Sequence, residues 1–345
     1  MGIGADLERE LLLAFRAAVR GLAAASLALY ALSFPMGIAA FFLTEGGRAA
    51  GGRALRAIPI ELFGAFDLRI PLGAKVWAVF LGLLALYAIC FAAAWFRSDP
   101  LGSGLIGSEE PKFPLLMPFI AGALFLSAIA IHGLQESQGI PTGSLRAEDE
   151  FIELFSLTYS PLMEELSYRI SPFGAYFALR LLLAARRRGL GPMASYLGSL
   201  ARAFFDPPGA KRAMGLPRGI STPEWALLAM TSAWFGLGHY LSGSGWGPGK
   251  ITSAAVVGLG LGLAHLKYGA PAPILIHWFF NYHMKACGMA ARFWHQLSIL
   301  GDLCEFLALS AGLVGLGYMA FWALDRALIR WGAIERAARG SQKRN

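Results

Sequence analysis

Long apolar runs recur along the whole chain and alternate with shorter segments rich in glycine, proline and charged residues. A helix of about 20 apolar residues is long enough to cross the hydrocarbon core of a bilayer. We therefore predict an all-α integral membrane protein with eight transmembrane helices. The predicted spans lie near residues 21–44, 76–96, 113–133, 151–185, 224–241, 251–267, 271–290 and 303–324.

Proline and glycine modify two of these spans. The fourth, 151–185, is longer than one crossing requires, and we expect it to tilt or break around Ser171-Pro172 because proline removes a helix hydrogen bond. In the sixth span, the glycine run from Gly258 to Gly262 predicts that neighbouring helices approach closely.

Two connecting segments have an amphipathic pattern. Residues 53–70 alternate arginine with apolar residues, and residues 193–205 place apolar residues at helical spacing. Both suit short segments that lie on the membrane surface; the alternative is an ordinary loop packed on the bundle. The apolar residues are Leu55, Ile58, Ile60, Leu62 and Phe63 in the first, and Met193, Tyr196, Leu197, Leu200, Phe204 and Phe205 in the second.

Composition agrees with a single membrane domain. The chain is 56% hydrophobic and 15% charged, whereas soluble domains are usually about 25% charged. We divide it into N-terminal helices with an interfacial loop (1–150), a core (151–290), and a last helix with a basic tail (291–345). The net charge of +8 gathers between and after the spans. We therefore expect the lipid bilayer as a partner and no nucleic acid.

Charge also predicts the orientation of the chain. The segment 186–222 and the tail after residue 325 are basic and should be cytoplasmic, whereas the segment 134–150 is acidic and should lie outside. Both termini would then be cytoplasmic, in the plasma membrane if the source is prokaryotic. The segment 45–75 conflicts, since it has a mild basic excess but would lie outside.

The first polar motif lies in the fourth span and reads Glu164-Glu165-Leu-Ser-Tyr-Arg169. Charge inside a membrane span is costly, so by default it marks a functional site. Glu165 and Arg169 are one helical turn apart, which predicts an ion pair. Glu164 points about 100° away on a helix and is therefore the carboxylate available as a general base. The alternative is a charge network that only holds helices together.

Two further motifs lie in later spans. Phe235-Gly-Leu-Gly-His239 ends in a histidine inside an apolar segment, where interhelical hydrogen bonding is the alternative role. His277 and Asn281 are one turn apart and together could donate hydrogen bonds to a developing oxyanion; a polar clamp between helices is the alternative. Three polar motifs in three spans predict one polar cavity within the membrane.

Other chemistries have weaker support. The sequence has no HExxH, Walker A or CxxC motif, and Cys90, Cys287 and Cys304 fit small packing residues in apolar segments. We expect no cofactor, although two glutamates and two histidines could bind zinc. A proton-coupled transporter would predict inverted repeats, and none is evident.

The three motifs, each in its own span and in this order, resemble the CPBP family of CAAX proteases and bacteriocin-processing proteins, also called ABI. That family includes the type II CAAX prenyl endopeptidases. The resemblance covers residues 150–285, with Ser160-Pro161 and the stretch 258–273 also similar to the family pattern. One departure is Ile170 after Arg169, where the family usually has glycine.

The resemblance implies an eight-helix glutamate-type intramembrane endopeptidase with a cavity open to the cytosol. Glu164 would activate water with the help of His239, while His277 and Asn281 would stabilise the oxyanion or hold that water. Glu165 and Arg169 would organise the site. The expected substrate is a membrane-anchored or membrane-docked protein whose tail or leader is processed. The alternatives are a zinc-dependent version and a non-proteolytic immunity, maturation or scaffold protein.

Overall fold

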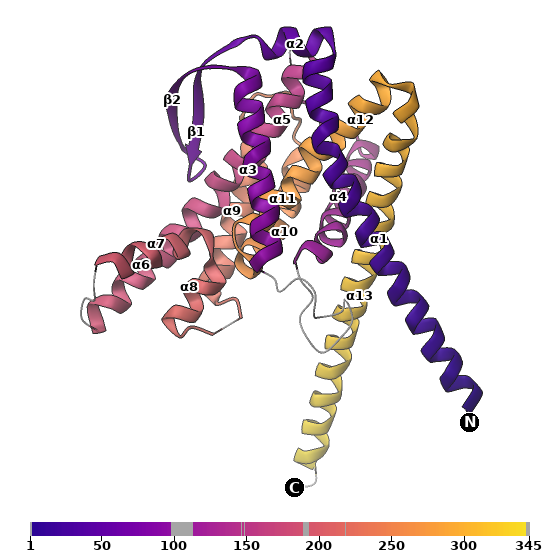
Figure 1. The fold of residues 1–345 in the computed structure, drawn as a ribbon. Coiled ribbons are helices and arrows are strands. Elements are labelled where there is room, and N and C mark those ends of the chain that lie inside the picture. The colour runs from indigo at the N-terminus through magenta and orange to yellow at the C-terminus, as the bar shows by residue number, and fades with distance from the viewer. Residues whose placement is uncertain are drawn as a thin grey trace.

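The computed structural model describes residues 2–97, 113–145, 147, 149–188, 193–217 and 219–342. Most of them are helical, as predicted, and the helices pack into a bundle (Figure 1). The α-helices are α1 (Gly2–Leu43), α2 (Glu45–Gly51), α3 (Val76–Arg97), α4 (Phe113–Ser137), α5 (Glu150–Glu165), α6 (Ser171–Arg188), α7 (Met193–Phe205), α8 (Pro207–Met214), α9 (Thr222–Leu241), α10 (Lys250–Tyr268), α11 (Pro271–Trp278), α12 (Met284–Phe293) and α13 (Ser298–Gln342). A 3₁₀ turn, η3, covers His295–Leu297.

Part of the orientation prediction falls outside the described part of the chain. This applies to Arg146, Glu148, Arg218, Lys343 and Arg344, and to the side chains of Arg186, Arg187, Arg188, Arg330, Arg336 and Arg339. The side chains of Met193 and Tyr196, which belong to the predicted amphipathic segment, also lie outside the described part. The start of α1 and the end of α13 lie at one end of the bundle, and α2 lies at the opposite end (Figure 1).

Within the described ranges, five helices are long and apolar enough to cross a membrane. They are Glu8–Leu43, Val76–Phe96, Phe113–Ser137, Lys250–Tyr268 and His295–Ala327. The other three predicted spans, 151–185, 224–241 and 271–290, are also largely helical. They carry the polar motifs, and two of them are interrupted. Length and composition alone therefore support a membrane protein with five such helices.

Two π-helical segments interrupt the motif-bearing helices, at η1 (Leu166–Ile170) and η2 (Phe279–His283). The first ends directly before Ser171-Pro172, where the sequence predicted a break. Pro172 has no N–H to donate, and the N–H of Ser171 bonds to the carbonyl of Leu166, five residues back. Such wide turns are frequent at functional sites because they turn side chains away from regular helical positions.

A β-hairpin replaces the membrane-surface segment predicted for residues 53–70, and it corrects the all-α prediction. Strand β1 (Ala54–Leu62) pairs antiparallel with β2 (Phe66–Lys75). The alternation of polar and apolar residues here has a period of two, which is the period of a strand. In Figure 1 the hairpin leaves the end of the bundle where α2 lies and turns back along its side.

The second amphipathic segment, 193–205, is helical, as its spacing predicted. This helix, α7, packs on α6, where Phe204 fits against Gly174. Leu197 and Phe205 are exposed, which suits a helix at a membrane surface.

Glycines bring α9 and α10 into close contact. A Cβ atom on Gly236 would overlap the carbonyl oxygen of Ile251, and a Cβ atom on Gly262 would overlap the side chain of Leu228. At Gly258, an added Cβ would lie 2.9 Å from a guanidinium nitrogen of Arg169. The close approach predicted for the glycine run is therefore confirmed, and it brings α10 against both the first and the second motif.

We predict that Gly236→Ala lowers the free energy of unfolding by about 1–3 kcal/mol, because the new methyl group overlaps backbone that cannot move alone. Denaturant unfolding in detergent measures this. Gly82→Ala in α3 is the control, since no heavy atom lies within 4 Å of its Cβ position. Alanine should stabilise that helix by about 0.5–1 kcal/mol. Similar effects of both substitutions would contradict the packing argument.

Candidate active site

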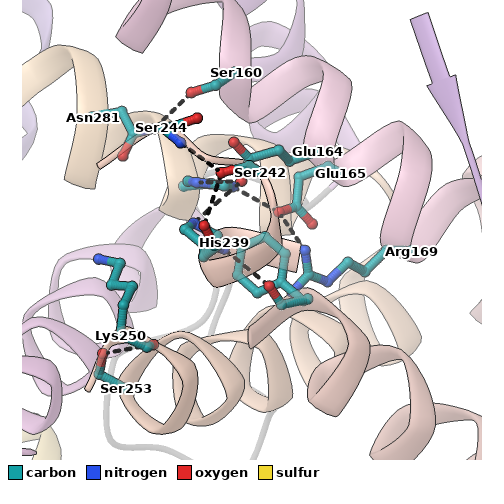
Figure 2. Close-up of polar contacts among 12 residues, drawn as sticks. Ser160, Glu164, Glu165, Arg169, His239, Ser242, Ser244, Lys250, Ser253 and Asn281 are labelled. Carbon is teal, nitrogen blue, oxygen red and sulfur yellow. Dashed lines mark hydrogen bonds and ion pairs between the residues drawn. The ribbon is translucent and has the colours of Figure 1, made fainter. Parts of the chain in front are cut away.

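The three polar motifs meet at one cavity of about 750 Å³. Its walls come from the hairpin, α5, η1, α9, α10, α11 and η2. Four of the six predicted site residues line it, namely Glu164, His239, His277 and Asn281. Glu165 and Arg169 lie behind this wall and are fully buried. Figure 2 shows Glu164, Glu165 and Arg169 on one helical stretch, with His239 reaching toward them from α9.

Glu164 faces two imidazole rings. Its Oε2 atom lies 3.6 Å from Nε2 of His277 and 3.9 Å from Nε2 of His239. The glutamate side chain is 26% exposed, whereas the histidines are 6% and 17% exposed. Glu164 Oε2 has no hydrogen-bond partner among the described residues. A small polar molecule lying between these three atoms could therefore form hydrogen bonds that bridge the glutamate and the histidines.

Hydrogen bonds on the far side of each ring define its tautomer. Nδ1 of His239 lies 2.9 Å from the carbonyl oxygen of Phe235, and Nδ1 of His277 lies 2.8 Å from Oε1 of Glu165. A carbonyl or carboxylate oxygen only accepts, so each Nδ1 must carry the proton. When the rings are neutral, both Nε2 atoms thus turn their lone pairs toward Glu164.

Glu165 joins the first motif to the third. Its Oε1 atom accepts from a guanidinium nitrogen of Arg169 at 3.0 Å, which is the predicted pair, and also from His277. The guanidinium lies 4.1 Å from the ring centroid of Phe235, where Gly258 leaves room for it. Oε2 of Glu165 and the Nε and Nη2 atoms of Arg169 have no hydrogen-bond partner among the described residues. The pair still resists separation, because each charge would be costly alone.

Asn281 lies on another part of the wall. Its Nδ2 atom donates to Oγ of Ser160 at 2.9 Å, joining η2 to α5. The regular helical turn assumed for His277 and Asn281 is absent, because η2 begins between them. Both side chains nevertheless line the same cavity.

Sequence reasoning missed several residues that line the cavity. Lys250 lies at the start of α10, with its ammonium nitrogen 4.2 Å from the ring centroid of Trp246. Glu61 comes from the hairpin, and burial, together with the charge of Glu164, raises the pKa of its carboxyl group. Neither residue belongs to a motif, and only the folded arrangement brings them to Glu164.

A second polar cluster lies apart from the cavity. His283, Cys287 and Cys304 are buried, and their ligand atoms lie within 4.8 Å of one another, so this group could hold a metal ion. No sequence motif indicated this group, because the two cysteines lie on different helices, and they were expected to be packing residues. None of the three lines the cavity.

Comparison with protein-family models, curated proteins and solved structures finds no match.

We predict that Arg169→Met lowers the free energy of unfolding by about 3–5 kcal/mol, because it leaves the charge of Glu165 buried and unpaired. Adding Glu165→Gln should restore part of the loss, which a double-mutant cycle in detergent measures. The control is Arg69→Met, since Arg69 pairs with Asp67 at 3.6 Å with side chains 79% and 52% exposed. Exposed pairs contribute little, so no change is expected there. If the losses of unfolding free energy in the two single variants simply add in the double variant, Arg169 and Glu165 are not coupled and the prediction is wrong.

Proposed function

We propose that this protein is an intramembrane endopeptidase of glutamate type that hydrolyses a peptide bond in a membrane-anchored or membrane-docked protein. The observation that carries the proposal is the position of Glu164 Oε2, 3.6 Å and 3.9 Å from two histidine Nε2 atoms in a cavity within an apolar bundle. A carboxylate and two imidazoles aimed at one point are the groups needed to bind and deprotonate water.

The chemistry follows from the tautomers. A water molecule among these atoms would donate one hydrogen bond to Glu164 and one to Nε2 of His239. Glu164 takes a proton as the water oxygen attacks the carbonyl carbon, and later gives that proton to the leaving amine. Oxyanion stabilisation by His277 requires a proton on its Nε2 atom as well as on the Nδ1 atom that is bonded to Glu165.

Asn281 and the Glu165–Arg169 pair have supporting roles in this scheme. One amide hydrogen of Asn281 is used by Ser160, which leaves the second for the oxyanion. Glu165 orients His277, and Arg169 holds the carboxylate of Glu165 in place through their contact at 3.0 Å. Each donor to an oxyanion contributes about 10²–10³ in rate.

The proposal includes membership of the CPBP family, eight crossings and cytoplasmic termini, in the plasma membrane of a prokaryotic cell. It is supported by the order of the three motifs and by the meeting of their side chains at one cavity. Substrates would be proteins with membrane-anchored tails or leaders. No cofactor is required, although Glu164 and the two histidines have the donor types that zinc takes.

We predict that Glu164→Gln lowers the cleavage rate at least about 10²-fold, because glutamine cannot accept the proton. Purified protein in detergent with a chelator is incubated with synthetic tail peptides and membrane-anchored reporter proteins, and mass spectrometry detects the cuts. Glu305→Gln in α13 is the control, as this exposed glutamate lies outside the cavity. It should leave the rate unchanged.

The other outcomes separate the alternatives. Cleavage that a chelator abolishes and zinc restores would identify a zinc enzyme with the same residues as ligands. Cleavage that persists in Glu164→Gln would reject the role of this residue. If the wild-type protein cuts no member of the panel, a scaffold, immunity or maturation role replaces the protease.

A further inference from the structure

The hairpin is held against the bundle at both ends. At its base, Arg53 pairs with Asp149, the N-cap of α5, at 3.1 Å. At its tip, the N–H of Gly64 donates to Oγ of Ser167 in η1 at 2.8 Å, and the indole N–H of Trp234 donates to the carbonyl of Gly64 at 2.9 Å. Strand β1 therefore runs beside α5 from its start to the π turn that follows Glu164.

The tip is also strained. Phe63 has a φ of 57°, a left-handed conformation that is rare for a bulky residue. Gly64 follows with a φ of 65°, and a Cβ atom there would overlap the ring of Trp234. Strain of this kind persists only where the surrounding structure enforces it, and it often marks a functional site.

The two faces of the hairpin differ in polarity. Phe66, Leu68 and Ile70 lie on one face and are 65%, 52% and 48% exposed. Asp67 pairs with Glu61 on the other face, and Glu61 lines the cavity. An apolar outer face and a polar inner face suit a strand between lipid and a polar cavity.

Two prolines show which backbone groups of the hairpin point away from the partner strand. Proline cannot donate to a strand partner, so within a pair it occupies positions whose backbone points away from the neighbouring strand. Pro59 pairs with Arg69, and Pro71 pairs with Ala57. These two pairs are two residues apart along the strands, so both are of the kind whose backbone groups do not bond across the hairpin. The residues of β1 that direct backbone groups to its open edge are then Ala57, Pro59 and Glu61. Among the described residues, no hydrogen bond from outside the hairpin reaches them.

The cavity extends along α5, and Glu61 is the residue of this edge that lines it. Glu153, Ser156, Ser160 and Glu164 line it from one face of the helix. These residues cover eleven helical steps, or about 16 Å. An extended peptide rises about 3.3 Å per residue, so the cavity is long enough for a segment of five residues ending at Glu164.

We propose that an extended segment of the substrate protein binds as a third strand on the open edge of β1, between the hairpin and α5. This inference rests on the proposed function and specifies the form of its substrate. The N–H and C=O of Glu61 and the C=O of Pro59 then hydrogen-bond to the substrate backbone, as in other cases of strand addition. Such a strand would satisfy the backbone groups at the open edge of β1, which are costly to leave unpaired beside lipid. A transmembrane helix would have to unwind here before cleavage.

A backbone scan tests the bound form of the substrate. A peptide from the panel that the wild-type protein cuts is remade with one amide at a time replaced by an ester. A strand turns every second residue toward its partner, so KM should rise at alternate positions on one side of the cleaved bond. Dependence on consecutive positions, or on none, would overturn strand addition while leaving the peptidase intact.

Matched substitutions test the strand edge itself. Glu61→Pro removes the N–H that points to the open edge of β1, and we expect KM to rise about two- to tenfold for the lost hydrogen bond. Asp67→Pro is the control, because Asp67 lies directly opposite Glu61 and its N–H faces the outer edge. Glu61→Gln keeps the N–H and separates loss of the carboxylate from loss of the hydrogen bond. Unfolding in detergent should be alike in both proline variants.

The outcomes distinguish the two proposals. An equal rise of KM in Glu61→Pro and Asp67→Pro would reject pairing at β1. Cleavage with unchanged KM in both would also reject it and would favour a substrate held elsewhere in the cavity. Absence of cleavage by the wild-type protein would reject the peptidase and the strand together.

Discussion

A buried carboxylate constrains the whole site. Glu165 is fully buried and accepts hydrogen bonds from Arg169 and His277. A charge in an apolar bundle is costly without partners, so the end of α5 and the end of α11 must meet at this carboxylate. The position of His277 follows from that contact. Glu164 immediately precedes Glu165 in the chain and is positioned together with it.

A second set of contacts surrounds the same pair. The ring of Phe235 lies under the guanidinium of Arg169 and 4.6 Å from the ring of His239, measured between centroids. Gly258 and Gly236 remove the side chains that would keep α10 at a distance. The glycines of the second motif therefore serve packing, and the histidine at its end is positioned as a consequence.

Sequence alone predicted the helices and the meeting of the three motifs, because apolar length and helical spacing are local properties. It also predicted the Glu165–Arg169 pair, whose partners are one turn apart. It could not predict the bond between Glu165 and His277, which are 112 residues apart, because helix rotation depends on packing. The π turn at η2 shifted Asn281 toward Ser160. The hairpin was missed because its alternation was taken for a surface segment.

The prolines of the hairpin have a further consequence. An exposed strand edge tends to pair with the same edge of another molecule, and proteins suppress such self-association with prolines and charges. Pro59 interrupts the inner edge, and Pro71 with Arg69 interrupts the outer one. These residues would disfavour pairing between the hairpins of neighbouring copies. An open strand edge can thus be kept available without acting as a template for a continuous sheet.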